Sequence, residues 1–348
     1  MQTLRSHRLA LGILFVICAL VAYGKLAFIG TTESGDYKSY IESAQALAGL
    51  PAAPHPERLL KPLAPLGTTL LAPITGDFPS AFILEVLIGY FALALVLYLL
   101  GYDFFGRKKQ ALAFALLAAL SYPVLRYGVD LYTETGALFF YIASLLLTLR
   151  YLKAPSKKLI VANALVISLG FLWKEYSVVN AIIFGLLLLT ERIAPYERIK
   201  NIALFIAAGL PLSLLVQAWV YLSYHYTYLN WYLDAAANSS GFEVEFTLKN
   251  IVKSFAALLG LAWLFVPLGA WRFKALEPYK RRFLIFAIIP PFIAPLWEHV
   301  SSRIFYPIAP AFLLLAILGI WALPKWLRAP VVALALILNV VALVVLAT

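Results

Sequence analysis

Long apolar runs separated by short charged segments constrain this chain more than any other feature of its sequence. Of its 348 residues, 63% are hydrophobic and only 13% are charged, too few polar residues to cover a soluble domain of this size. Because a helix needs about 20 apolar residues to cross a bilayer, we predict an all-α integral membrane protein with about eleven transmembrane helices in a single domain, residues 1–348. These helices are expected near residues 9–29, 80–101, 110–126, 131–150, 159–173, 176–190, 201–223, 251–271, 283–297, 304–322 and 331–347.

The segment 59–75 decides the predicted sidedness. It is apolar but short, and Pro62, Pro65 and Pro73 interrupt it. If it does not span, one side of the membrane holds 19 of the 28 basic residues but only four of the 17 acidic residues. Such an excess of lysine and arginine is typical of the cytoplasmic side. We therefore interpret 59–75 as an interfacial or re-entrant helix on the outer side, with the N-terminus in the cytoplasm.

Two long loops are expected on the outer side. The first, residues 30–79, contains an amphipathic helix over 36–49, because Tyr37, Tyr40, Ile41, Ala44, Leu47 and Ala48 recur at helical spacing. Together with 59–75 it would form an interfacial helix pair. The second loop, residues 224–250, overlaps the aromatic stretch Tyr221–Tyr232, which fits an interfacial aromatic belt or a sugar-stacking surface.

The first outer loop carries three charged residues of interest. Asp36 stands at the start of the expected helix, where a carboxylate caps backbone N–H groups and can also serve chemistry. Arg58 and Lys61 both stand at the start of the proline-broken segment. They fit two roles, anchoring at the interface with the side chains reaching toward water, or binding a phosphate at the level of the lipid headgroups.

Further charges lie at the same predicted boundary. They are Asp130, Glu134, Lys174, Glu175, Glu298, His299 and Arg303, and Glu85 lies one turn inside its helix. Any one of them can simply end a helix, but a charge within a bilayer costs at least about 2.5 kcal/mol unless it is paired or near the interface. Their gathering on one face predicts a polar cavity that opens outward.

Several functional classes lack their signatures. The sequence has no Gly-rich phosphate loop, no cluster of cysteine and histidine, and no RNA-binding motif, and Cys18 is its only cysteine. His299 with Asp36 or Glu134 would offer ligands to a divalent metal, but the spacing is not that of a metal site. The metal therefore stays open, and no nucleic-acid partner is expected.

The order of these features resembles the C-type (GT-C) glycosyltransferases that use polyprenyl-phosphate sugars, including the protein O-mannosyltransferases and aminoarabinose transferases. The resemblance rests on four segments: Gly35-Asp36-Tyr37 through Ala44-Gln45-Ala46-Leu47, Leu60-Lys61-Pro62-Leu63, Thr133-Glu134, and Ser302-Arg303 through Pro310. It implies a catalytic base or metal ligand at Asp36, a recurring acid at Glu134, and donor-phosphate contacts at Lys61, Arg58 and Arg303.

The resemblance implies transfer of a sugar from a polyprenyl-phosphate donor to a glycan, lipid or protein acceptor. The reaction would take place on the extracytoplasmic face, in a prokaryotic plasma membrane. Asp130, Lys174, Glu175, Glu298 and His299 would support the site. Two alternatives remain at this point, a secondary transporter and a non-catalytic scaffold or lipid-binding subunit. A transporter is expected to have broken helices near the bilayer midplane, for which Pro290-Pro291 and Lys174-Glu175 are the candidates.

Overall fold

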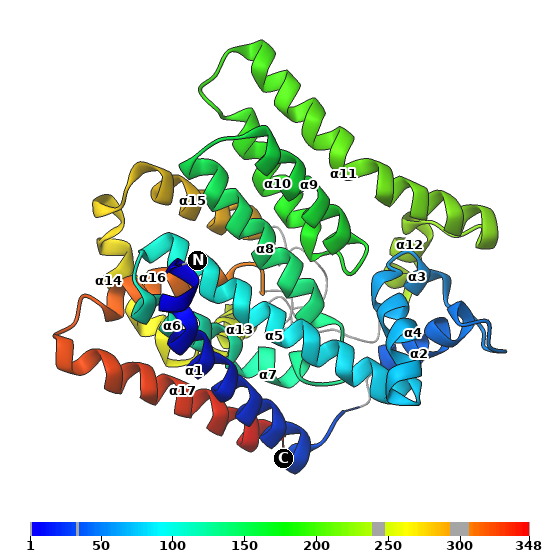
Figure 1. Cartoon of the computed structure of the whole chain (residues 1–348), viewed down its shortest axis with the longest axis horizontal. Coiled ribbons are helices and arrows are strands. Elements are labelled where there is room, and N and C mark those ends of the chain that lie inside the picture. Colours follow the sequence, from blue (N-terminus) through cyan, green and yellow to red (C-terminus); the bar gives the residue numbers. More distant parts are fainter. Residues whose placement is uncertain (1, 33–34, 239–247, 293–305, 348) are drawn as a thin grey trace.

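Helices make up the regular structure of this chain throughout its described part. The computed structural model describes residues 2–32, 35–238, 248–292 and 306–347, and no strand occurs among them. Figure 1 shows a bundle of helices, with short helices of the first loop gathered at its right-hand edge. The predicted all-α class is therefore confirmed.

Within the described residues, six helical stretches are long and apolar enough to cross a membrane. They are His7–Ile29 (α1, Gln2–Gly24, continued by the π-helix η1, Lys25–Ile29), α5 (Phe78–Phe105), α8 (Glu134–Lys153), α11 (Pro195–Tyr224), Lys249–Trp271 (α13, Leu248–Leu259; η3, Gly260–Phe265; α14, Val266–Trp271) and Lys325–Val345 within α17 (Lys325–Ala347). A bent pair, α6 (Lys108–Ala119) and α7 (Tyr122–Gly128), makes a seventh if it is one span.

The remaining predicted spans are shorter than the membrane requires or lie partly outside the described residues. Helices α9 (Lys157–Phe171), α10 (Tyr176–Leu189), α15 (Pro278–Ile288) and α16 (Ala309–Ile320) have 15, 14, 11 and 12 residues. At 1.5 Å per residue, none of them reaches across about 30 Å of hydrocarbon. The count of about eleven spans thus stays a prediction.

Helix α5 illustrates how local sequence sets the ends of these elements. Asp77 precedes it in an extended conformation, and its carboxylate accepts a hydrogen bond from the Ser80 amide at 2.7 Å. Gly106 ends it in the left-handed conformation, with φ of 68°. An acidic N-cap and a C-terminal glycine are the residues that complete unsatisfied helix ends at least cost.

The core forms where α5, α6, α8 and α16 pack together. Small residues let their backbones approach, as at Gly89, where an added Cβ would lie 3.1 Å from the Gly136 amide. Buried tyrosines then fasten distant segments. Tyr141 donates to the carbonyl oxygen of Pro307 at 2.8 Å, and Tyr306 donates to that of Pro123 at 2.5 Å.

The first loop folds into three short helices, α2 (Gly35–Leu47), α3 (Pro56–Leu59) and α4 (Leu63–Thr75). The amphipathic helix expected over 36–49 is α2, and its stripe packs on protein, since Tyr40, Ile41 and Ala44 are buried beside α4 and α5. The segment 59–75 is helical from Leu63 onward. Its interfacial position stays a prediction.

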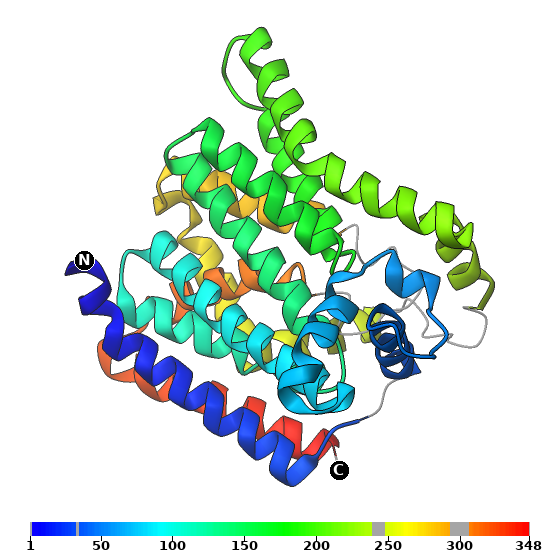
Figure 2. The ribbon, with the colours of Figure 1, turned by 45° about the vertical axis from the view of Figure 1, so that its right-hand side comes forward.

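The second loop also contains a helix. Helix α11 ends at Tyr224, the next residue, His225, turns the chain with its positive φ of 52°, and α12 (Tyr228–Asn238) follows. Figure 2 shows α11 running along the upper edge of the bundle to bring α12 close to the first-loop helices. Val220, Leu59 and Leu60 are buried together there, with Trp231 packed against them. The two long loops thus meet at one end of the bundle.

Candidate active site at the first-loop end of the bundle

Asp36 lies in the first turn of α2 and forms an ion pair with Arg58. The Arg58 Nη2 atom donates to the Asp36 Oδ1 atom at 2.6 Å, and Arg58 Nε donates to the hydroxyl of Ser39 at 2.7 Å. The guanidinium also lies 4.7 Å from the centre of the Tyr40 ring. The Asp36 side chain is 51% exposed, whereas that of Arg58 is 14% exposed. An accessible carboxylate is therefore held by a largely covered cation.

Lys61 follows α3 and is almost fully buried. Its ammonium donates to a carboxylate oxygen of Glu175 and lies 4.5 Å from the centre of the Trp231 ring. Burial raises the pKa of Glu175, but the charge of Lys61 and its hydrogen bond lower it by more, so the net shift is downward from the ordinary 4.5. Lys61 thus connects the first loop to the α9–α10 junction and to α12.

Glu134, at the start of α8, forms a third pair with Lys174. The Lys174 ammonium donates to Glu134 Oε1 at 2.7 Å, and the Glu134 side chain is completely buried. Burial lowers the pKa of Lys174, but Glu134 and then Tyr176 and Tyr40 raise it by more, so the pKa lies above its ordinary value. Lys174 is therefore a fixed positive charge at this site.

Neighbouring contacts connect these three pairs into one group. The Thr133 hydroxyl, just before α8, donates to the Tyr40 hydroxyl at 3.5 Å. The Tyr40 ring therefore contacts both the start of α8 and the Arg58 guanidinium above it. Lys174 and Glu175 are adjacent, and Arg58 and Lys61 are one turn apart. We call Asp36, Arg58, Lys61, Glu134, Lys174 and Glu175 the outer-loop cluster. Six residues singled out from sequence therefore share one end of the fold.

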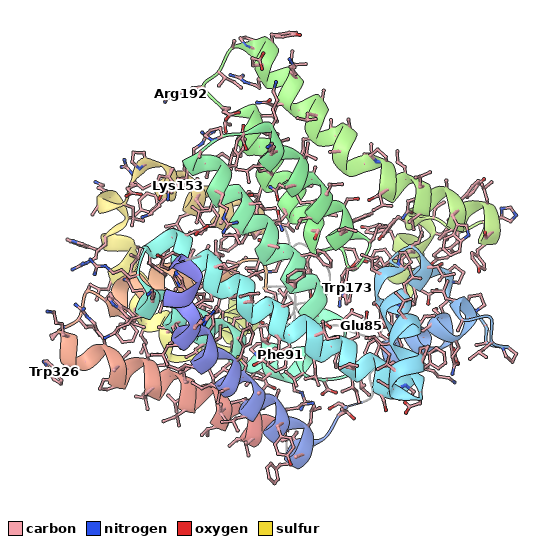
Figure 3. All side chains as sticks on the ribbon, viewed as in Figure 1. Glu85, Phe91, Lys153, Trp173, Arg192 and Trp326 are labelled. Carbon is pink, nitrogen blue, oxygen red and sulfur yellow. The ribbon has the colours of Figure 1, made fainter. Side chains whose placement is uncertain are left out.

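Backbone contacts hold the segments of the outer-loop cluster in place. The Leu63 amide donates to the carbonyl oxygen of Leu172 at 3.2 Å, and the indole of Trp173 donates to that of Thr133 at 2.9 Å. Figure 3 places Trp173 at this end of the bundle, beside Glu85. The charged residues are thus mounted on packed helix ends rather than on loose loop.

Asp130 belongs to a different ion pair. It accepts from Lys25 at 2.7 Å and from the Thr32 and Leu131 amides at 2.6 and 2.8 Å, and its side chain and that of Lys25 are both 1% exposed. This pair connects the start of η1 to the segment before α8. Its geometry fits a buried structural tie.

Glu85 is buried in α5 and faces α4. One of its oxygens accepts from the Thr68 hydroxyl at 2.6 Å, while Oε1 has no hydrogen-bond partner among the residues that the structure describes. An added Cβ at Gly67 would overlap Glu85. Glu85 therefore fastens α4 to α5.

Three predicted site residues, Glu298, His299 and Arg303, lie outside the described residues. Within the described ranges, no three residues of the types histidine, cysteine, aspartate and glutamate come together to hold a metal ion. Sequence reasoning did not predict that the Tyr40 ring contacts Arg58 or that the Trp231 ring contacts Lys61. The excess of aromatic residues in both outer loops was the available signal, but it did not identify their partners.

Comparison with known proteins decides the fold family. Residues 55–222 match the family described as dolichyl-phosphate-mannose-protein mannosyltransferase. The structure superposes on ArnT from Cupriavidus metallidurans bound to undecaprenyl phosphate, with a TM-score of 0.67 and 14% identity over 91% of this chain. The chain has the GT-C fold. The expected resemblance to the GT-C glycosyltransferases is confirmed.

Two further structures have the same GT-C fold. The oligosaccharyltransferase of Archaeoglobus fulgidus in the apo form matches 97% of this chain with a TM-score of 0.63 and 14% identity. ArnT from Cupriavidus metallidurans in the apo state matches 92% of this chain with a TM-score of 0.62 and 13% identity. The chain spans 61% of the length of ArnT and 56% of that of the oligosaccharyltransferase. No curated protein sequence matches it. With its apolar helices, this fold marks an integral membrane protein.

Proposed function

We propose that the chain transfers a sugar from a polyprenyl-phosphate donor to an acceptor at the outer-loop cluster. The observation that carries the proposal is the gathering of three cations and three carboxylates at one end of a GT-C fold. Charges near a membrane are costly unless they are paired or used. A lipid-linked phosphate is a ligand that such cations suit, and ArnT has been solved with undecaprenyl phosphate bound.

The donor phosphate would be bound by Arg58 and Lys61. Both lie at the α3–α4 junction, and both side chains are largely covered by apolar and aromatic groups. As the sugar–phosphate bond breaks, its electron pair leaves with the phosphate, whose charge grows. Positive groups in a water-poor site stabilise that charge more strongly than they would in water. Arg303 is proposed to join them.

Asp36 is the proposed general base. The acceptor oxygen attacks the anomeric carbon of the sugar, a new carbon–oxygen bond forms, and the acceptor proton passes to the Asp36 carboxylate. In the structure Arg58 holds this carboxylate. An incoming phosphate would compete for Arg58 and leave Asp36 available to the acceptor. Inversion at the anomeric carbon is implied by the resemblance.

Glu134 and Lys174 would act as a unit. Complete burial keeps the Glu134 carboxylate from the solvent-facing part of the cluster, whereas the Lys174 side chain is 18% exposed. Glu134 is therefore proposed as a positioning residue that fixes Lys174 toward the substrates. This assigns the recurring acid a supporting role.

The test is transfer of radiolabelled sugar from a set of polyprenyl-phosphate sugars by the purified protein. Asp36→Asn is expected to reduce transfer by about 10²- to 10⁴-fold, the usual contribution of a general base. Asp234→Asn is the matched control, because Asp234 is an exposed acid on α12 that hydrogen-bonds to Tyr226 outside the cluster. Full activity in folded Asp36→Asn would refute the role of Asp36.

Donor binding separates this proposal from the transporter alternative. Wild-type protein should bind the polyprenyl-phosphate sugar in detergent, and Lys61→Met should weaken that binding. A protein that binds no lipid phosphate but takes up a soluble solute into vesicles would be a transporter instead.

A further inference from the structure

A second cationic site lies at the opposite end of the bundle. A groove of about 470 Å³ runs between α6 and α17, and Lys109, Lys325 and Arg328 line it at the first turns of the two helices. Figure 3 shows Trp326, on the first turn of α17, at the left, far from Glu85 and Trp173 near the outer-loop cluster. The groove therefore does not belong to the site described above.

The walls of the groove are apolar beyond the three cations. Leu112, Ala113 and Leu116 follow Lys109 along one face of α6, and Ala329, Val332, Ala333 and Leu336 follow Arg328 along one face of α17. Both helices begin at the cationic end, so these side chains lead away from the charges in the same direction. The groove thus has a positively charged end and an apolar remainder.

The positive charge of the groove has no acidic partner in its lining. Two acids outside the groove are paired with other cations: Asp103 accepts from Arg150 at 2.6 Å, and Glu277 pairs with Lys280 at 3.2 Å. Among the described residues, Arg328 Nε donates to a backbone carbonyl oxygen, that of Leu323. Three like charges around one groove repel one another, and an anion between them would relieve that repulsion.

The depth of the groove matches a membrane boundary. Trp326, next to Lys325 on the first turn of α17, is 74% exposed, as tryptophans at a membrane–water interface are. By the charge distribution of the sequence this boundary is the cytoplasmic one, where anionic lipids are concentrated. Basic pockets between transmembrane helices on that side are suited to phospholipid headgroups.

We infer that the α6–α17 groove binds an anionic phospholipid of the cytoplasmic leaflet, with its phosphate between Lys109, Lys325 and Arg328 and an acyl chain along the apolar walls. The ligand would be a resident lipid and not the sugar donor, since the donor phosphate is assigned to the other end. Charge complementarity and the joined apolar tail favour a lipid over a free anion.

The experiment measures lipid binding to delipidated, full-length protein by native mass spectrometry. Phosphatidylglycerol should bind, and phosphatidylcholine of the same chains should bind more weakly. Replacing all three cations (Lys109→Gln, Lys325→Gln, Arg328→Gln) should weaken phosphatidylglycerol binding by on the order of a hundredfold, given roughly fivefold for each basic residue near an anionic lipid.

Two controls make the result decisive. The triple variant Lys157→Gln, Lys158→Gln, Lys274→Gln removes the same charge from exposed residues outside the groove, and should leave binding within about twofold of wild type. An equal loss in both triple variants would overturn the inference in favour of general surface attraction.

The apolar part of the groove is tested separately. Ala333→Phe fills the wall without changing charge, and should weaken phosphatidylglycerol binding while the protein stays monodisperse. Unchanged binding in this variant would overturn the placement of the acyl chain. Inorganic phosphate that displaced the lipid at equal concentration would overturn the lipid as ligand.

Discussion

The buried pair of Glu134 and Lys174 gives a quantitative test of how the site is held. Glu134→Gln removes the carboxylate but leaves Lys174 charged, with a side chain only 18% exposed. Removing one partner of a fully buried ion pair costs about 3–5 kcal/mol. The partial exposure of Lys174 and the Tyr176 ring 5.6 Å from its ammonium reduce this cost. We expect a loss of about 2–3 kcal/mol in the free energy of unfolding.

The second half of the cycle removes both charges. Lys174→Met in the Glu134→Gln background should recover most of the lost stability, because no unpaired charge then remains buried. Unfolding of the detergent-solubilised protein by titrated denaturing detergent, followed by tryptophan fluorescence, gives the four free energies of the cycle. The coupling between the two residues should exceed about 1 kcal/mol.

A matched pair at the opposite end provides the control. Asp103 accepts from Arg150 at 2.6 Å, about the distance in the buried pair, but the two side chains are 25% and 44% exposed. Asp103→Asn should therefore cost no more than about 1 kcal/mol. If Glu134→Gln cost no more than Asp103→Asn, or the cycle gave no coupling, burial would not be what makes this pair strong. The positioning role of Glu134 would then fall.

Three further predictions concern the site and its support. Lys61→Met should raise the KM for the lipid-linked donor by more than tenfold. Lys61→Arg should keep much of the affinity, because the positive charge remains. Equal KM values for the two variants would exclude a phosphate contact by Lys61. Gly269→Ala should destabilise the fold by about 1–3 kcal/mol, since an added Cβ would overlap the Leu315 carbonyl. Gly12→Ala is the control, because its Cβ meets open space and should not destabilise the fold. Thermal unfolding midpoints measure both effects. Lys61 lowers the pKa of Glu175 below 4.5, so the hydrogen bond between them stabilises the fold above pH 4.5 and is lost as the pH falls below that value. Glu175→Gln should flatten this part of the curve of unfolding free energy against pH. An unchanged slope would contradict the lowered pKa.

Local features of the outer loops could be predicted well from sequence. The helical spacing of Tyr40, Ile41 and Ala44 located α2 to within about two residues of its ends. Of the three prolines expected to interrupt 59–75, Pro62 stands where a new helix begins at Leu63, whereas Pro65 and Pro73 lie within α4. Both features depend on neighbours in sequence, so the chain itself contains the information. The helix α12 within the second loop was not predicted, because its aromatic residues fit several surfaces equally well.

The partners of the charged residues could not be predicted. Asp36 and Arg58 are 22 residues apart, Glu134 and Lys174 are 40 apart, and Lys61 and Glu175 are 114 apart. Asp130 and Glu134 were expected at the same boundary and in the same site, yet Asp130 pairs with Lys25 before α8 begins. For each acid, several basic residues were expected at the same depth in the membrane, so the sequence did not single out its partner.

The sequence by itself determined that this chain enters a membrane, that it is helical, and that its charges divide unevenly between two ends. Apolar runs decide the first two, because a backbone in hydrocarbon must satisfy its own hydrogen bonds and a helix does so within one segment. Only the tertiary structure decided which helix ends meet, and therefore which acid faces which base. That choice depends on close approach at small residues such as Gly89 and Gly136, and packing of this kind fixes helix rotation to within a side chain's reach.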